Sequence, residues 1–138
     1  MLGLMGEHPN AALARHTWEA ISRGDAESLR ELLSPEIVWH ATALGTPWSG
    51  ARRGYDAIVD FLARVGEMTD TFDAKWIDVL TSDERVLVIF HVSLGIGARR
   101  TEVDYLLLGR VESGRLAEVW TAPLDPTAIE SFWATKSG

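Results

Sequence analysis

The chain has 138 residues, and since domains commonly contain about 100–150 residues, one domain over residues 1–138 is expected. Its net charge of −7 argues against nucleic acid and anionic membranes as partners, because both carry negative charge themselves. The absence of cysteine excludes disulfides, thiolate nucleophiles and thiolate metal ligands.

Apolar residues recur at helical spacing in three segments of the first half of the chain. The first segment begins at Asn10, a good N-cap residue, and ends at Gly24, which is typical of a helix C-terminus. Asp25 caps the second, which ends before Ser34-Pro35. The third covers about residues 55–69. Three amphipathic helices are therefore predicted.

The rest of the chain has the pattern of strands. Residues 37–42 are rich in β-branched and aromatic side chains, and four more strands follow the third helix. Turns of a few residues separate these four strands, so they pair antiparallel. A short helix over about residues 125–133 closes the chain. The order of elements predicts an α+β fold with helices on one face of a curved sheet. The four later strands are expected at 71–80, 85–94, 101–111 and 115–122.

Hydropathy argues against a membrane protein. The longest apolar run, Val86–Phe90, has five residues and is too short to cross a bilayer. The N-terminal segment is apolar but lacks the basic residues and the length of a signal sequence. We therefore expect a soluble cytoplasmic protein.

Several short motifs occur in a characteristic order. They are Arg23-Gly24-Asp25, Val38-Trp39-His40, Arg53-Gly54-Tyr55-Asp56-Ala57-Ile58 and the segment from Gly114 to Trp120. With them the chain resembles the SnoaL-like branch of the nuclear transport factor 2-like superfamily, which includes ketosteroid isomerase and polyketide cyclases. The resemblance implies a cone in which a mostly antiparallel sheet wraps around three N-terminal helices and encloses one pocket. It also implies a homodimer formed through the outer sheet face.

His40 is the first candidate catalytic residue. Alternation along its strand puts His40 in one row and Trp39 in the other, and the pattern does not decide which row faces inward. By resemblance, His40 falls where ketosteroid isomerase carries its general base, which favours the inward orientation. A histidine there suits proton transfer at neutral pH. The alternative is a surface or hydrogen-bonded structural histidine.

His91 and Tyr105 complete the candidate catalytic set. His91 lies in an almost continuous apolar strand, where a polar group needs a partner, and by resemblance it falls near one position of the epoxide hydrolase Asp-Arg-Asp set. Alternation along residues 103–111 turns Tyr105 and Leu107 inward and Asp104 outward. The Tyr105 hydroxyl would donate a hydrogen bond to a substrate carbonyl. The alternative for both candidates is a purely structural role.

Six tryptophans indicate either an aromatic core or an aromatic cavity. Trp18 lies on the buried stripe of the first helix and is expected to form a pocket wall. Trp48, in the loop after the first strand, is expected to act as a lid. Trp120 and Leu107 are further candidate ligand-binding residues. Trp39 would lie on the outer sheet face if His40 points inward.

No metal and no cofactor are expected. A zinc site needs three or four convergent ligands, and besides His40 and His91 the chain has only His8 and His16. Nucleotide and flavin motifs are also missing from the sequence.

These observations support two classes of function. The first is a cofactor-independent enzyme that isomerises, cyclises or dehydrates a small apolar carbonyl compound of polyketide or terpenoid type, with His40 as general base or acid. The second is a non-catalytic module of the same fold that binds a small molecule or dimerises. Epoxide hydrolysis is a further alternative, although the arginine of the Asp-Arg-Asp set is missing.

Overall fold

The computed structural model describes residues 7–43 and 46–134, and two helices open it. In α2 (Pro9–Arg23), Asn10 is not the N-cap: His8 is, and its Nδ1 accepts a hydrogen bond from the Asn10 backbone N–H at 3.0 Å. Gly24 ends the helix in the left-handed conformation, with φ of 67°, as the sequence predicts. Asp25 caps α3 (Ala26–Leu32) through the Ser28 N–H.

The six strands form one curved sheet in the order β2-β1-β6-β5-β4-β3. All neighbouring strands pair antiparallel except β1 and β6, which run parallel. The short edge strand β2 was not predicted, because its glycine and arginines have no strand pattern of their own. The strand bounds are β1 (Leu33–Ala41), β2 (Gly50–Arg53), β3 (Thr71–Thr81), β4 (Arg85–Ile96), β5 (Arg99–Glu112) and β6 (Arg115–Pro123).

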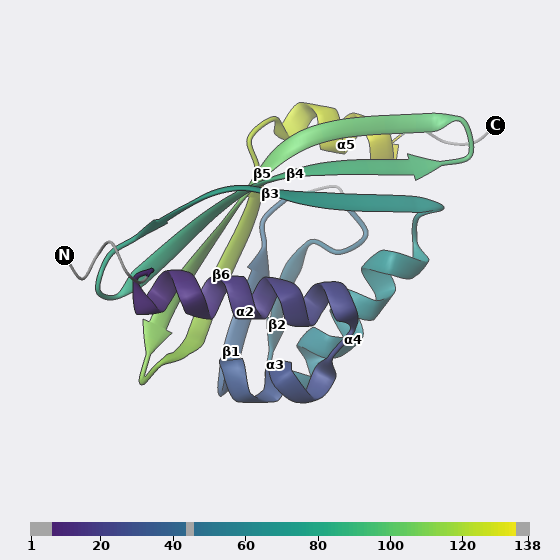
Figure 1. Cartoon of the computed structure of the whole chain (residues 1–138). Helices are drawn as coiled ribbons and strands as arrows, with labels where there is room; N and C mark the ends of the chain where they lie inside the picture. Colours follow the sequence, from purple (N-terminus) through teal and green to yellow (C-terminus); the bar gives the residue numbers. More distant parts are fainter. Residues whose placement is uncertain (1–6, 44–45, 135–138) are drawn as a thin grey trace.

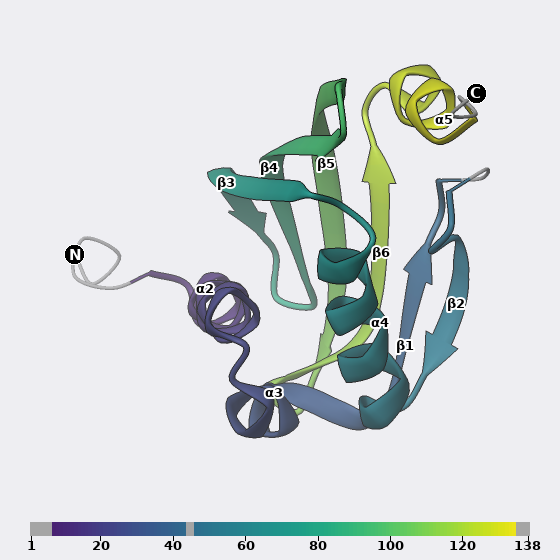
Figure 2. The same ribbon diagram turned by 90° about the vertical axis from the view of Figure 1, so that its right-hand side faces the viewer.

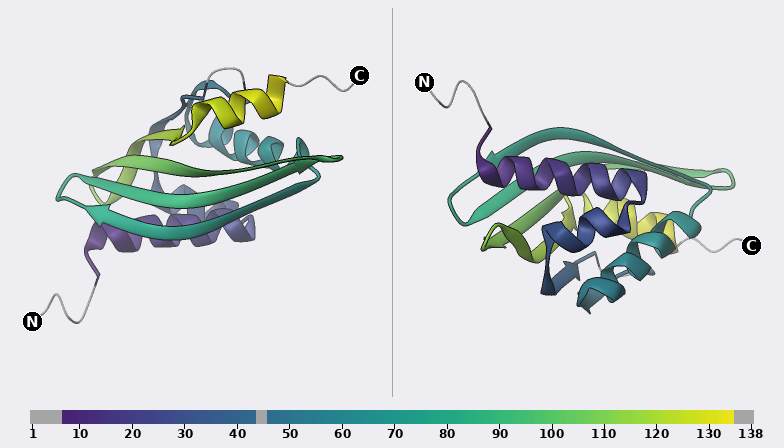
Figure 3. Two further views of the ribbon diagram at one scale, coloured as in Figure 1. Left: turned by 90° about the horizontal axis from the view of Figure 1, so that it is seen from above. Right: turned by 60° about the horizontal axis from the view of Figure 1, so that its bottom comes forward.

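The helices α2, α3 and α4 (Tyr55–Glu67) gather on one side of the sheet, which bends around them (Figures 1 and 2). Seen from above, the long strands β3, β4 and β5 pass over α2 (Figure 3). The last helix, α5 (Pro126–Ala134), packs against β5 and β6. The predicted α+β fold, a curved and mostly antiparallel sheet wrapped around N-terminal helices, is thus confirmed.

The helix-facing side of the sheet carries the core. Ile37 and Val119 on the paired strands β1 and β6 are fully buried, as are Ile58 of α4 and Ile129 of α5. In β1 and β6, the residues that alternate with this buried row face the opposite side of the sheet, and His40 and Trp120 among them are only half-buried. Below, these sides are called the inner and the outer face.

None of the helices within residues 7–43 and 46–134 has the length and apolar character needed to cross a membrane. Residues 1–6, which the sequence analysis considered as a signal segment, lie outside the described residues.

Gly109 of β5 gives a test of inner-face packing. A Cβ there would lie 2.6 Å from Leu116 Cδ2 and 3.3 Å from Val86 Cγ1, and both of these side chains are fully buried. We expect Gly109→Ala to lower the free energy of unfolding by about 1–3 kcal/mol, because the core must be overpacked. Urea denaturation followed by tryptophan fluorescence would measure the change.

Gly66→Ala is the matched control. Gly66 lies in α4 with nothing within 4 Å of the added Cβ, so the same substitution should stabilise the protein by about 0.5–1 kcal/mol through helix propensity. If Gly109→Ala were neutral, the close packing described for β5 against Leu116 would be incorrect.

Candidate functional site

A cavity of about 500 Å³ lies between the inner sheet face, α2 and α4. We call it the aromatic pocket. Most of its wall is aromatic or aliphatic, and the side chains that can form hydrogen bonds are few. Its rings belong to Trp18, Trp39, Trp48, Phe61, Phe72, Phe90 and Tyr105. Its aliphatic residues include Ile21, Leu62, Val65, Val92 and Leu107, and its polar residues besides Tyr105 and the tryptophans are Ser22, Asp73 and Thr121.

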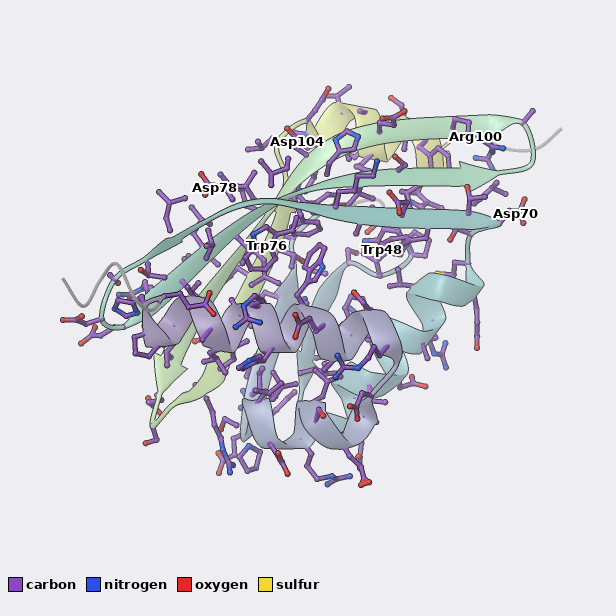
Figure 4. All side chains as sticks on the ribbon, viewed as in Figure 1. Trp48, Asp70, Trp76, Asp78, Arg100 and Asp104 are labelled. Atoms are coloured by element: carbon purple, nitrogen blue, oxygen red, sulfur yellow. The ribbon has the colours of Figure 1, made fainter. Side chains whose placement is uncertain are left out.

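Ring contacts fix the pocket wall. The Trp18 ring meets Trp76 edge to face at 5.5 Å between centroids and Phe90 at 5.3 Å, and Phe90 stacks on Tyr105 at 5.6 Å. Trp48 and Trp76 lie between the sheet and the helices (Figure 4). Such aromatic pairs contribute about 0.5–1.5 kcal/mol each beyond their buried area. The wall is therefore held by helix-to-sheet contacts that exist without a ligand.

Two buried hydrogen-bond donors in this wall have no acceptor within the described part of the chain. They are the Tyr105 hydroxyl and the Trp39 indole Nε1, on side chains that are only 7% and 4% exposed. Burial raises the pKa of Tyr105 to about 12, and the nearby Trp48 side chain offsets part of that rise. Tyr105 therefore keeps its proton at neutral pH and offers a donor.

Four of the residues suggested by the sequence analysis line this pocket: Trp18, Trp48, Tyr105 and Leu107. Trp48 is 7% exposed and packs edge to face on Trp133 at 5.0 Å, so it forms part of the core as well as the wall. Alternation along β5 was enough to find Tyr105 and Leu107, because the charged neighbours Asp104 and Arg110 mark the outer row.

His40 does not face the pocket. Trp39 points inward against Phe61, so alternation turns His40 to the outer face. There its Nε2 lies 2.7 Å from Glu118 Oε2, and its ring stacks on Trp120 with 5.3 Å between centroids. The expectation of an inward His40 is wrong, because burying the large Trp39 ring removes far more apolar surface from water than burying an imidazole.

Trp120 shares this outer position, which corrects its proposed place in the pocket. It pairs with His40 across β1 and β6, whereas the next residue, Thr121, lines the pocket. The hydrogen bond from His40 and the charge of Arg110 hold the pKa of Glu118 below its usual value. This outer group thus consists of mutually satisfied charges on one side of the sheet.

His91 also lies on the outer face. Its Nδ1 is 2.8 Å from Asp104 Oδ1 and its Nε2 is 2.8 Å from Glu102 Oε1. Both ring nitrogens therefore have the hydrogen-bond partner expected for a polar side chain in an apolar strand. The hydrogen bond to Asp104 and, to a smaller extent, the one to Glu102 raise the pKa of His91 above its usual value. Asp104 is drawn on the side of the sheet away from Trp48 and Trp76 (Figure 4). Within residues 7–43 and 46–134, no group of three or more metal-ligating side chains is arranged to hold a metal ion.

Sequence reasoning missed Trp39, Phe61 and Phe90 as pocket residues. Phe61 belongs to the apolar stripe of α4, and Phe90 shares its row with the buried Val88 and Val92 of β4. The spacing of apolar residues therefore indicated that both face inward. Trp39 lies in the more apolar row of β1, and the same criterion would have turned it inward.

The raised pKa of His91 predicts a pH-dependent stability. The folded state favours protonated His91, so the contribution is full below the ordinary pKa of about 6.5 and is lost as the pH rises through the raised value. His91→Gln should therefore destabilise the protein more at about pH 5.5 than at about pH 8.5. Urea denaturation at both pH values measures this. His16→Gln, at an exposed position of α2, is the control, and an equal loss at both pH values for His91→Gln would contradict the prediction.

A family model described as the SnoaL-like domain matches residues 14–119. The uncharacterized protein Rv0034 of Mycobacterium tuberculosis is 29% identical over 141 residues, which cover 94% of this chain and all of that protein. Bal32a, from a soil-derived mobile gene cassette, has a structure similar to this one with a TM-score of 0.82 and 29% identity, over 91% of this chain and 96% of that one.

IdmH, a candidate polyketide cyclase from Streptomyces antibioticus, superposes with a TM-score of 0.71 and 22% identity, over 93% of this chain and all of that one. This likeness concerns the fold alone. The family match runs from α2 to β6 and thus includes the helices and strands that enclose the aromatic pocket. The chain therefore belongs to the SnoaL-like domain family.

Proposed function

We propose that this protein binds a small, apolar, ring-containing molecule with a carbonyl oxygen in the aromatic pocket. The observation that carries the proposal is the Tyr105 hydroxyl, which is buried in the pocket wall without a hydrogen-bond acceptor among the described residues. An unpaired buried donor costs about 1–3 kcal/mol, and a ligand carbonyl offsets that cost by accepting a hydrogen bond from the hydroxyl.

The pocket wall determines the rest of the ligand's character. Flat rings from Trp18, Phe61 and Phe90 favour a flat apolar partner, which gains from both buried area and ring contacts. The volume of about 500 Å³ lies within the usual range for small-molecule sites. Trp39 Nε1 is a second free donor in the wall, so a ligand with two acceptor oxygens fits the same chemistry.

Binding has better support than acid–base conversion. Enolisation or dehydration needs a base within hydrogen-bond reach of the substrate, and both His40 and His91 are hydrogen-bonded to carboxylates on the outer face. Among the described lining residues, the only carboxylate belongs to Asp73, an exposed residue on the edge strand β3. Tyr105 can polarise a carbonyl but, with its high pKa, is not a base at neutral pH.

Two ring compounds of the same shape test the hydrogen bond. 9-Fluorenone carries a carbonyl and fluorene does not, and quenching of tryptophan fluorescence reports binding of either. We expect Tyr105→Phe to weaken fluorenone binding roughly 2- to 10-fold, as for the loss of one neutral hydrogen bond, and to leave fluorene binding unchanged.

His40→Gln is the control for the first test. Its side chain lies on the far side of the sheet, so the affinity for both compounds should stay within about twofold, which is below the effect of one hydrogen bond. If Tyr105→Phe weakened the binding of fluorenone and fluorene equally, the proposed hydrogen bond from Tyr105 to the carbonyl would be contradicted. If His40→Gln weakened fluorenone binding as much as Tyr105→Phe, the assignment of His40 to the outer face would be contradicted.

We also propose that a second copy of the chain covers the outer sheet face. The centre of this face is apolar, with half-buried side chains from three adjacent strands, and the satisfied His40 and His91 groups flank it. An exposed apolar area of this kind marks an interaction surface. The central side chains are Leu87, Ile89, Leu106, Leu108 and Trp120.

Sedimentation velocity tests the dimer. The protein should sediment at twice its chain mass of 15.2 kDa, and Leu108→Glu should shift it to the monomer because the charge would be buried between copies. Ala63→Glu introduces the same charge on the exposed side of α4 and should leave the dimer intact. If the wild-type protein sedimented as a monomer, the proposed dimer interface would be contradicted.

A further inference from the structure

A second hollow, with a volume of about 730 Å³, lies at the end of the fold where α3, the start of β1, the end of β2 and the start of α4 meet (Figure 2). We call it the arginine hollow. It shares no lining residue with the aromatic pocket. Its charged residues are Arg30, Arg53, Arg115, Glu31 and Asp56.

The arginines of the hollow differ from all the others in the chain. Of the eleven arginines, five form ion pairs with carboxylates, and three more donate hydrogen bonds to backbone carbonyl groups. The guanidinium groups of the remaining three form no hydrogen bond and no ion pair with any described residue. These three are Arg30, Arg53 and Arg115, and all of them line the arginine hollow.

One of the three is already held in place. The Arg30 guanidinium lies over the Tyr55 ring at 4.1 Å from its centroid, and the Tyr55 hydroxyl donates a hydrogen bond to the Ala26 carbonyl oxygen. Stacking on an aromatic face leaves the N–H groups at the guanidinium edge free for a ligand. Less side-chain freedom is then lost on binding, because Arg30 is ordered beforehand.

The local charge favours an anion in a chain that is acidic overall. Three arginines face two carboxylates in the lining, so the hollow is positive although the whole chain carries −7. Glu31 and Asp56 form no ion pair with these arginines and do not neutralise them directly. The backbone N–H groups at the start of α4 add partial positive charge, since Gly54 provides no side-chain cap.

We propose that the arginine hollow binds a phosphoryl oxyanion, either free phosphate or the phosphate group of a small organic molecule. Guanidinium groups bind phosphate oxygens through paired, charge-assisted hydrogen bonds, and three of them around one hollow match a dianion. The volume exceeds what free phosphate needs, so a phosphate ester also fits. This site is independent of the ligand proposed for the aromatic pocket.

Isothermal titration calorimetry with inorganic phosphate and phenyl phosphate tests the proposal. Both probes should bind the wild-type protein. The double variant Arg53→Gln/Arg115→Gln should weaken binding by about tenfold or more, because two charge-assisted contacts are removed. Tighter binding of phenyl phosphate would identify an ester as the ligand type, and equal binding would identify free phosphate.

Arg23→Gln/Arg64→Gln is the matched control, because it removes two positive charges that are paired with Asp25 and Asp60 outside the hollow. Its affinity for both probes should stay within about twofold of the wild type, since no ligand contact is lost. Circular dichroism and fluorenone binding would show that both double variants remain folded. Absence of wild-type binding at millimolar phosphate, or an equal loss in the control variant, would overturn the proposal.

Discussion

Neighbouring side chains of each strand point to opposite faces of the sheet, and only one face lies against helices. Every strand therefore buries one of its two rows on the same side of the sheet. Once Trp39 is buried against Phe61, His40 has to lie outside, and once Tyr105 stacks on Phe90, Asp104 has to lie outside as well. The contents of the pocket and the chemistry of the outer face are thus two consequences of one alternation.

The aromatic wall explains why a cavity persists inside so small a domain. Edge-to-face contacts favour one relative orientation of each ring pair, so the rings are held in place instead of turning into the cavity. Trp18 is held by both Trp76 and Phe90, and Trp48 is held by Trp133. The walls stay apart, and the Trp39 and Tyr105 donors have no acceptor among residues 7–43 and 46–134.

Charged groups on the surface are arranged mainly by local pairing. Most charged groups of this acidic chain are satisfied locally, as when His91 bridges Asp104 and Glu102 or when His40 and Arg110 share Glu118. The arginine hollow departs from this rule, because its guanidinium groups have no carboxylate partner in the described part of the chain. Unpaired cations gathered in one hollow of an anionic protein are therefore the feature of its surface that local pairing does not explain.

Local signals in the sequence were sufficient for most of the fold. Gly24 ends α2 and Asp25 caps α3, and both depend only on neighbours within a few residues. The hairpins of β3 to β6 follow from short turns, and charged neighbours showed which row of β5 faces inward. The edge strand β2 was not predicted, because its pairing with β1 rather than its own composition makes it a strand.

The sequence indicated the orientation of β1 only weakly. One row holds Ile37, Trp39 and Ala41 and the other holds Val38, His40 and Thr42, so the rows differ little in apolar character, and the resemblance to ketosteroid isomerase favoured an inward His40. The choice depends on β6, which runs parallel to β1 and pairs Trp39 with Val119 and His40 with Trp120, eighty residues further along the chain. The amino-acid order determined the elements other than β2, the family and the inward Tyr105. Only the tertiary structure could decide which aromatic rings enclose the pocket, because that depends on long-range pairing and on which large side chain gains most from burial.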